Sequence, residues 1–319
     1  MPSQYRIAFW NAENLFDTED SPRREQKVAR ALGRDITGWT QALLDRKIQQ
    51  VASFIQTMNG GRGPDIIGLC EVENEFVVDL LKRALAPLGR NYAIVHHDTQ
   101  DNRGIDVAFL YDDNKFNVEA TFNHFIMRRN ATRDILQVNF LTAKGRRLII
   151  MGNHWPSRSG GESESAPYRA MAGETLAYFH ERALEVNGAD TPVLAMGDFN
   201  DEPFDTSLVN YALGLRTPRK VLSGRNPYFL NLMWPLMGNG EGTFFFDEAP
   251  NLFDQILVNK NLVLPNSPIR VKTGSVKILR PGSSLTPIRF GGMGKPINQD
   301  GFSDHFAIEV ILTEANTPS

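Results

Sequence analysis

The segment Pro192-Val193-Leu194-Ala195-Met196-Gly197-Asp198-Phe199-Asn200-Asp201 combines a strand pattern with a ligand pattern. Its first half is an apolar run of the length that a fully buried strand needs. The run breaks at Gly197 and ends in Asp198 and Asn200, whose oxygen atoms suit a site that holds Mg²⁺ and a water against a phosphate. A Gly-Asp turn with solvated side chains has the same sequence pattern, so the rest of the chain must decide.

Composition indicates a soluble globular protein. The chain has 319 residues, of which 41% are hydrophobic and 22% charged, which is enough for a large core. Its length allows one large α/β domain or two smaller ones. No break in composition, charge block or Pro/Ser-rich linker divides the sequence, so we expect a single catalytic domain over residues 1–319.

Charge and cysteine content limit the classes of partner and site. The net charge of -3 gives no global basic field for nucleic acid, although a bound metal can supply local positive charge to a phosphodiester substrate. A single cysteine, Cys70, excludes an intrachain disulfide framework and a cysteine-based zinc site. Because Cys70 follows the apolar run 66–69, we expect it to be buried.

No segment is long and apolar enough to span a membrane. Residues 1–4 lead directly into a strand-like run, and no signal peptide is visible. We therefore expect a cytoplasmic protein, or a secreted or periplasmic one if the sequence has been trimmed. We also expect a monomer.

Hydrophobic periodicity predicts alternating strands and helices. Apolar or alternating runs predict strands at residues 5–10, 65–70, 92–96, 105–111, 116–126, 134–142, 148–151, 193–198, 253–258 and 306–312. Helical spacing predicts helices at residues 40–57, 77–85 and 168–183. The order suggests α/β layers with mixed sheets rather than a simple doubly wound fold.

Four segments between these elements are expected to be irregular. Residues 17–39 are predicted as a surface loop or short helix, whose basic side chains we interpret as a solvated face rather than a basic lip for a polyanion. Residues 157–166 are predicted as a loop, and residues 202–250 as mostly loop with short helical patches. Residues 265–300, rich in Gly and Pro, form a long loop of the kind that is functional or mobile.

Polar residues recur at the ends of the predicted strands. Asn11, Glu71, His154 and the pair Asp198/Asn200 each follow an apolar strand, whereas Asp254 and the pair Asp304/His305 precede one. If the last two strands run antiparallel to the first four, all six positions meet along one edge of the sheet layers. So many coincidences are hard to assign to chance turns.

The residue types at these positions fit one chemistry. Asn11, Glu71 and Asp304 are hard oxygen ligands that suit Mg²⁺ or Mn²⁺. Asp198 and Asn200 can hold a water. His154 and His305 can donate hydrogen bonds or protons to phosphate oxygens, and Asp254 can orient a histidine as a carboxylate does in a triad.

The order of these motifs resembles the endonuclease/exonuclease/phosphatase superfamily, which includes pancreatic-type deoxyribonuclease, exonuclease III-like abasic-site endonucleases, neutral sphingomyelinases and inositol-polyphosphate phosphatases. The similarity runs from residue 5 to 312 and rests on Asn11, Leu-Cys-Glu71-Val-Glu-Asn, Gly-Asn153-His154-Trp-Pro, Gly197-Asp198-Phe-Asn200-Asp201, Phe-Asp254-Gln-Ile-Leu and Phe-Ser303-Asp304-His305. It implies an α/β (α+β) four-layer sandwich, in which two mixed sheets pack face to face with helices outside, and phosphoester hydrolysis with Mg²⁺ or Mn²⁺.

The resemblance also implies roles for individual residues. Glu71 holds the metal with Asn11 and Asp304 nearby. Asp198 and Asn200 align the attacking water, and His305, oriented by Asp254, contacts the scissile phosphate. His154 stands where deoxyribonuclease-like and sphingomyelinase-like members have a catalytic histidine and abasic-site endonucleases have a tyrosine, which argues against a typical abasic-site enzyme. Whether His305 or Asp198 is the general base stays open.

Two arginines flank the motifs. Arg103 and Arg158 could each clamp phosphate oxygens in a bidentate way. The alternative is a structural ion pair, for instance with Asp106 or Glu162. Asp98 is a weaker candidate for orienting His154, and the remaining histidines (His96, His97, His124 and His180) are assigned to packing or the surface.

We favour a metal-dependent phosphodiester hydrolase, specifically a nuclease that cleaves DNA or RNA by in-line attack of a metal-site water. The first alternative is a phosphatase or a phospholipase C/sphingomyelinase-like hydrolase of a small or lipid phosphoester, which the aromatic stretch at residues 243–246 and the modest net charge favour. The second is a non-catalytic binding protein on a degenerate scaffold, which would have lost some of the catalytic positions.

Overall fold

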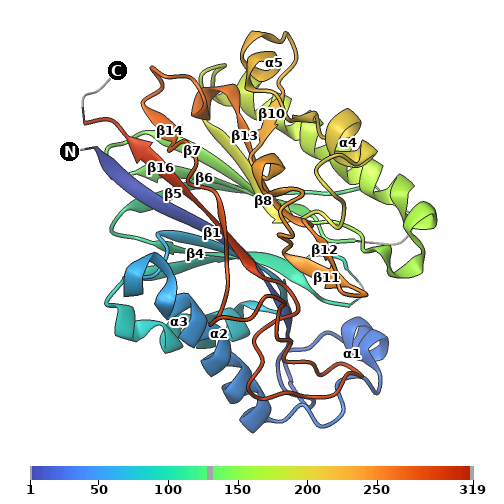
Figure 1. Cartoon of the computed structure of the whole chain (residues 1–319). Helices are drawn as coiled ribbons and strands as arrows, with labels where there is room; N and C mark the ends of the chain where they lie inside the picture. Colours follow the sequence, from blue (N-terminus) through green and yellow to red (C-terminus); the bar gives the residue numbers. More distant parts are fainter. Residues whose placement is uncertain (1, 102, 128–131, 317–319) are drawn as a thin grey trace.

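Two mixed sheets of seven strands each lie face to face in the computed structural model, which describes residues 2–101, 103–127 and 132–316 (Figure 1). The first sheet has the order β14 (Ile269–Val271), β16 (Ala307–Glu314), β1 (Ser3–Leu15), β2 (Ile66–Val72), β4 (Asp106–Asp112) and β3 (Tyr92–His96), with β15 (Lys277–Leu279) also paired to β16. The second has the order β5 (Phe116–His124), β6 (Ile135–Thr142), β7 (Arg147–His154), β8 (Val193–Asp198), β13 (Asp254–Asn259), β10 (Phe229–Asn231) and β9 (Gly214–Leu215).

Helices cover the outer face of each sheet and complete the four layers. Apolar side chains of α2 (Gln41–Gly61) and α3 (Glu75–Ala84) pack on β1, β2 and β4, and those of α4 (Glu162–Asn187) pack on β7 and β8. Figure 1 shows these two helical layers on opposite sides of the sheets. The predicted α/β four-layer sandwich is confirmed.

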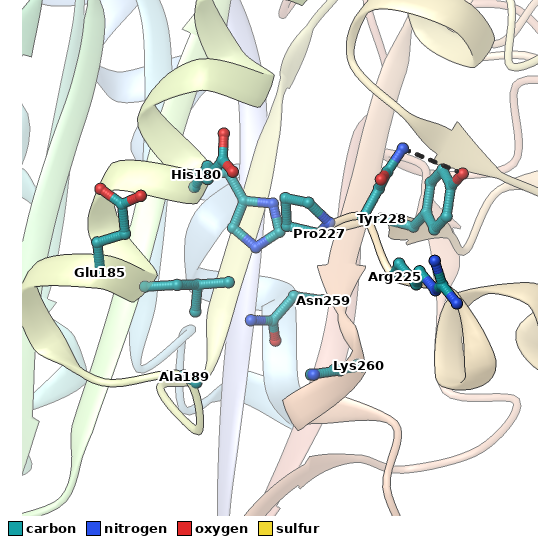
Figure 2. A pocket seen from close by; sticks show the side chains of 11 residues that line it. His180, Glu185, Ala189, Arg225, Pro227, Tyr228, Asn259 and Lys260 are labelled. Carbon is teal, nitrogen blue, oxygen red and sulfur yellow. Dashed lines mark hydrogen bonds between the residues drawn. The ribbon is translucent and has the colours of Figure 1, made fainter.

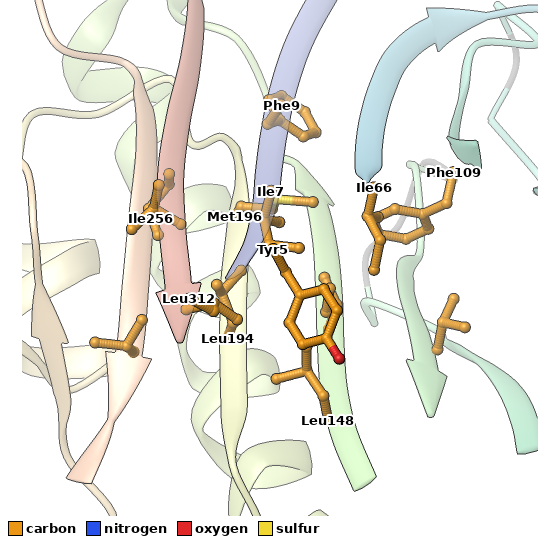
Figure 3. Packing of buried hydrophobic residues seen from close by; sticks show 14 of the residues in the cluster. Tyr5, Ile7, Phe9, Ile66, Phe109, Leu148, Leu194, Met196, Ile256 and Leu312 are labelled. Carbon is orange, nitrogen blue, oxygen red and sulfur yellow. The ribbon is translucent and has the colours of Figure 1, made fainter. Parts of the chain in front are cut away.

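Side chains with a period of two fill the space between the sheets. Phe9 and Ile66 from the first sheet meet Leu194 and Met196 from the second in one buried cluster (Figure 3). Phe109 on β4 has no exposed surface and makes an edge contact with Phe140 on β6, with ring centroids 6.4 Å apart. Burial of this kind is the main stabilising term in the fold.

The directions of the strands bring the strand ends that carry the predicted motifs to one edge of the two sheets. β1 pairs with β2 in parallel and with β16 antiparallel, and β8 pairs with β7 in parallel and with β13 antiparallel. The last two strands therefore run against the other four, as the meeting of the six polar positions requires. Cys70, on β2, is buried and free, as predicted.

The amphipathic helix predicted at residues 40–57 is α2. Its N-cap Thr40 accepts a hydrogen bond from the Leu43 amide, and its helical backbone ends at Met58, where ψ turns to 153°. Asn59 and Gly60 continue in the left-handed region, which glycine adopts at little cost.

The segment 17–39 is a surface segment with a short helix, as predicted, and Arg23 and Arg30 are exposed, but it is more tightly packed than expected. It contains the short helix α1 (Gln26–Leu32) and buries Trp39 against Phe290. Arg24 pairs with Glu73 at 2.7 Å, and its side chain is only 3% exposed. Arg24 therefore belongs neither to a solvated face nor to a basic lip for a polyanion, because its side chain is buried in a structural ion pair.

Three predicted loops contain secondary structure. Helix α4 begins at Glu162, inside the Ser/Gly/Glu stretch, because acidic residues favour the first turn of a helix. Residues 202–250 hold α5 (Pro218–Ser223), one of the short helical patches that were predicted. The short strands β9 and β10, and the hairpin of β11 (Phe244–Phe246) and β12 (Ala249–Asn251), were not predicted. Residues 265–300 hold β14 and β15. Strands of two or three residues are too short to show alternation.

Among residues 2–101, 103–127 and 132–316, no helix combines the length and apolar character needed to cross a membrane. Met1 lies outside the described residues.

The inter-sheet core makes a direct stability prediction. Phe109→Ala should lower the free energy of unfolding by about 3–5 kcal/mol, because it removes a fully buried ring from a close-packed interface. Phe122→Ala is the matched control, since Phe122 on β5 is 48% exposed and its truncation should cost less than about 1 kcal/mol. Chemical denaturation monitored by circular dichroism measures both, and equal losses would contradict this account of the core.

Candidate active site

The predicted polar residues meet where the two sheets adjoin. His154 on β7 and Asp254 on β13 lie directly opposite Asp198 on β8, and Asn11 on β1 is in register with Cys70, the residue before Glu71. Residues from both sheets thus share one buried edge, which is the geometry that the strand-end pattern predicted.

Asp198 is the centre of this cluster and is only 2% exposed. Its Oδ2 accepts a hydrogen bond from Asn11 Nδ2 at 3.1 Å and lies 3.8 Å from His154 Nε2 and 3.9 Å from His305 Nε2. Its Oδ1 accepts the backbone amide of Asn200 at 3.0 Å. The carboxylate is therefore fixed from both sides of the sandwich.

Local backbone geometry explains the Gly-Asp-Phe-Asn sequence. A Cβ on Gly197 would lie 2.1 Å from the carbonyl oxygen of Asn153 on the neighbouring strand, so no larger residue fits. Asn200 has a φ of 52°, in the left-handed region that asparagine tolerates better than most residues. Its side-chain amide donates to the Trp155 carbonyl at 3.1 Å, which holds the turn against β7.

His305 forms a buried dyad with Asp254. Its Nδ1 lies 2.7 Å from Asp254 Oδ2, and its backbone amide donates to Ser303 Oγ at 3.0 Å. Burial alone would lower the pKa of His305, but the carboxylates of Asp254 and Asp198 raise it well above the usual value. His305 is thus a positively charged donor aimed toward Asp198.

His154 has the opposite character. Burial, and then the charges of Arg133 and Arg103, lower the pKa of His154 well below its usual value, so the ring is neutral near pH 7. Its Nδ1 has no hydrogen-bond partner among the described residues, and its Nε2 lies 3.8 Å from Glu71 Oε1. The two histidines therefore differ in charge because their neighbours differ.

The three predicted metal ligands, Asn11, Glu71 and Asp304, lie close to His154 and His305. Glu71, the residue before the end of β2, has a φ of 61°, and its Oε2 accepts the Asn14 amide at 3.0 Å. Asp304 Oδ2 accepts a hydrogen bond from Arg289 at 2.9 Å. Asn11 Oδ1 accepts the Glu13 amide at 3.0 Å, which leaves that oxygen one lone pair.

These residues fit a hard divalent cation. Burial, together with neighbouring carboxylates, raises the pKa of Asp198 to about 7 and that of Asp304 to about 6. The folded chain therefore holds several carboxylates close together and offsets only part of their negative charge. A divalent ion would offset this charge, and carboxylate and amide oxygens are the donors that Mg²⁺ and Mn²⁺ prefer.

A profile of the Endonuclease/Exonuclease/phosphatase family matches residues 6–314. The chain belongs to this family. Its members are phosphoester hydrolases that generally depend on a divalent metal ion. A search of curated protein sequences finds no match.

Solved structures share the fold at low identity. One is D. rerio TDP2 complexed with a single-strand DNA product (15% identity, TM-score 0.59, covering 97% of this chain and 99% of that one). Another is the human Nocturnin catalytic domain with bound sulfate (16%, 0.57, 98% and 95%). A third is a Bacteroides thetaiotaomicron mannosyl-6-phosphatase (16%, 0.57, 97% and 99%).

Arg103 influences the site through its charge. Its side chain forms no hydrogen bond or ion pair with the residues that the structure describes, and its charge acts on both His154 and Glu71. Its backbone amide donates to Asp101 Oδ1 at 2.9 Å. Asn102, its neighbour in the motif, lies outside the described residues.

Arg158, unlike Arg103, is paired with acidic side chains. Its guanidinium contacts Glu162 at 3.1 Å, Asp201 at 2.8 Å and Asp205 at 2.6 Å, and its Nε donates to the Asn200 carbonyl at 2.8 Å. The structural ion pair, including the predicted Glu162, is therefore the arrangement present. Arg158 supports the turn that carries Asn200, and its bidentate face is already occupied.

The suggested contact between Asp98 and His154 is wrong. Asp98 lies in the loop after the edge strand β3 instead, and its Oδ1 is 4.0 Å from His96 Nδ1. Of the remaining histidines, His124 and His180 stack on Phe179 and Phe229, which confirms their assignment to packing.

Sequence reasoning missed four residues near the site. Buried Arg133 donates to the Trp155 carbonyl at 2.8 Å, and Glu13 accepts Arg289 Nε at 2.8 Å. Lys47, fully buried, donates to the Phe302 carbonyl at 2.7 Å and so fixes the loop that carries Asp304. Only Glu13 carried a signal, because it lies within the Asn11 motif.

A hollow of about 220 Å³ lies away from this cluster, at the far end of β13 (Figure 2). It is lined by His180 and Asn259, among others. Asn259 is five residues beyond Asp254, or roughly 16 Å along a strand. The hollow is therefore separate from the active-site edge.

The buried charge of Asp198 makes a stability prediction. In metal-free protein at pH 8, Asp198→Asn should raise the free energy of unfolding by on the order of 2 kcal/mol, because the raised pKa means that ionised Asp198 is disfavoured in the fold. Between about pH 4 and pH 7, Asp198 keeps its proton in the folded state and loses it in the unfolded state. The stability of the wild type therefore falls as pH rises through this range. The stability advantage of Asp198→Asn grows over the same range. Urea unfolding in EDTA at pH 4 and pH 8 measures it. An advantage that does not change with pH would contradict the assignment.

Proposed function

We propose that the protein is a Mg²⁺- or Mn²⁺-dependent phosphodiesterase that cleaves nucleic acid. The observation that carries the proposal is the convergence of Asn11, His154 and His305 on one oxygen of buried Asp198. In this proposal the Asp198 carboxylate orients the attacking water beside a charged donor, His305, which is what in-line hydrolysis of a phosphodiester requires.

A divalent ion held by Glu71, Asp304 and Asn11 would, when bound, neutralise charge on the phosphate. Asp198 and Asn200 orient the attacking water. His305, kept protonated by Asp254, donates to a phosphate oxygen and stabilises the charge that develops there. His154, kept neutral, offers a second donor or acceptor.

Two observations support nucleic acid as the substrate. The Arg103 guanidinium has no side-chain partner among the described residues and its charge acts on Glu71 and His154, so we expect it to contact a backbone phosphate of the substrate. Structural neighbours include a TDP2 with a DNA product. We further propose that the chain acts as a monomeric, single catalytic domain.

A lipid or small phosphoester is the second candidate. The ring of Phe244 lies 4.9 Å from that of His305, and Phe246 on the same hairpin is 73% exposed. An exposed aromatic beside the site suits a lipid tail, although it also suits base stacking. The neighbouring mannosyl-6-phosphatase supports a small phosphoester.

Nicking of supercoiled plasmid tests the primary proposal. Purified protein should nick the plasmid with Mg²⁺ or Mn²⁺ and not with EDTA. Asp198→Ala should reduce turnover by about 10²–10⁴-fold, since it removes a group that acts on the water. Asp190→Ala, an exposed aspartate before the same strand, is the matched control and should keep full activity.

Two outcomes separate the candidates. Nucleic-acid cleavage should weaken steeply as salt rises, whereas cleavage of a small soluble phosphoester should change little. A folded wild type that leaves plasmid intact but hydrolyses phosphoester substrates would replace the nuclease proposal, and turnover retained by Asp198→Ala would refute the site.

The two arginines give a paired prediction. Arg103→Ala should raise KM for a nucleic-acid substrate by roughly 10-fold with little change in stability, because it removes a charge-assisted phosphate contact. Arg158→Ala should instead lower the melting temperature, since it leaves buried Asp201 with fewer partners. Steady-state kinetics and thermal unfolding of both variants measure this, and the reverse pattern would exchange their roles.

A further inference from the structure

A second cluster of ligand-type side chains lies where β3 leads into β4. It consists of His96 at the end of β3, Asp98 in the following loop and Asp106 at the start of β4. One ligand atom from each residue lies within 4.8 Å of the other two. None of the three belongs to the set around Asp198.

His96 is buried without a hydrogen bond at one ring nitrogen. Its side chain is 2% exposed, and its Nε2 has no partner among the described residues. That nitrogen points to Asp106 Oδ2 at 3.8 Å, which is too far for a direct hydrogen bond. A buried nitrogen left in this state is costly, so a missing group between the two side chains would explain it.

The basic residues nearby are already paired. Arg23 pairs with Asp17, Arg24 with Glu73 and Lys27 with Glu25. Among the described residues, no lysine or arginine pairs with Asp98 or Asp106. Asp98 Oδ1 lies 4.0 Å from His96 Nδ1 and Asp106 Oδ2 lies 3.8 Å from His96 Nε2, so the two carboxylates flank the imidazole without a cationic partner among the described residues.

Solvent reaches the acidic side of this cluster. Asp98, Thr99 and Asp106 line a hollow of about 110 Å³, and the Asp98 side chain is 67% exposed. Asp98 can therefore move the short distance that closing around an ion requires, while His96 and Asp106 are held by their strands.

We propose that His96, Asp98 and Asp106 bind a divalent transition-metal ion, such as Zn²⁺ or Mn²⁺, at a site separate from the active site. One imidazole nitrogen with two carboxylate oxygens is a donor set that these ions accept, and water completes the coordination. Mg²⁺ suits the site less well because of its imidazole ligand.

The ion would brace the loop that presents Arg103. Asp106 Oδ1 accepts the hydroxyl of Thr99 at 2.6 Å, and Thr99 Oγ1 accepts the amide of Asp101 at 3.3 Å. Asp101 in turn accepts the Arg103 amide at 2.9 Å. A chain of contacts therefore joins the proposed ligands to the arginine whose charge acts on His154.

Metal content tests the proposal directly. EDTA-stripped wild type, His96→Gln and Asp98→Asn are dialysed against Zn²⁺, and bound zinc per chain is measured. Wild type should bind one more equivalent than either variant, or bind it at least 10-fold more tightly. The active-site ligands are intact in all three proteins, so the difference isolates this site. His97→Gln, an exposed neighbour, is the matched control and should behave like wild type.

Co²⁺ gives a second readout that does not depend on activity. Its visible absorption should lose one component in His96→Gln and keep it in His97→Gln. Equal zinc content and identical Co²⁺ spectra in wild type, His96→Gln and Asp98→Asn would overturn the proposal. Asp98→Asn keeps the test decisive if His96→Gln fails to fold, because Asp98 is exposed.

Discussion

The site depends on a carboxylate buried between two sheets. Asp198 ends a central strand of one sheet, and its Oδ2 is reached by Asn11 from the other sheet, by His154 from the adjacent parallel strand and by His305 from the loop before β16. A buried charge without such partners would be strongly destabilising. The packing of the two sheets therefore fixes the site, and a shift of one sheet against the other would separate these groups.

Charge is distributed unevenly around that carboxylate. The carboxylates of Asp254 and Asp198 act on His305, whereas the positive charges of Arg133 and Arg103 act on His154. The same residue type is thus protonated on one side and neutral on the other, which is a common way for enzymes to separate acid and base roles at one pH. Carboxylates with raised pKa values mark the side where a cation is expected.

The sequence predicted the long strands and the residues at their ends, because strand periodicity and motif order are local signals. Prediction from the sequence failed for features that depend on contacts between distant parts of the chain. Strands β14 and β15 are too short to show alternation, and they form only because β16 offers an edge. Arg158 looked like a phosphate clamp until the acidic residues around it were placed, and Arg133, Lys47 and Arg289 have no motif near them. The roles of the core residues stay predictions until variants are measured.

Backbone conformation at the site carries a cost of its own. Glu71 and Asn200 both sit in the left-handed region, where a residue other than glycine is strained by about 1–3 kcal/mol. Glycine at either position would relax the backbone while removing the side chain that the site needs. Variants selected only for thermal stability should therefore tend to change at these two positions and lose turnover. Proteins selected for activity must instead retain the strained backbone and offset its cost by packing elsewhere in the sandwich.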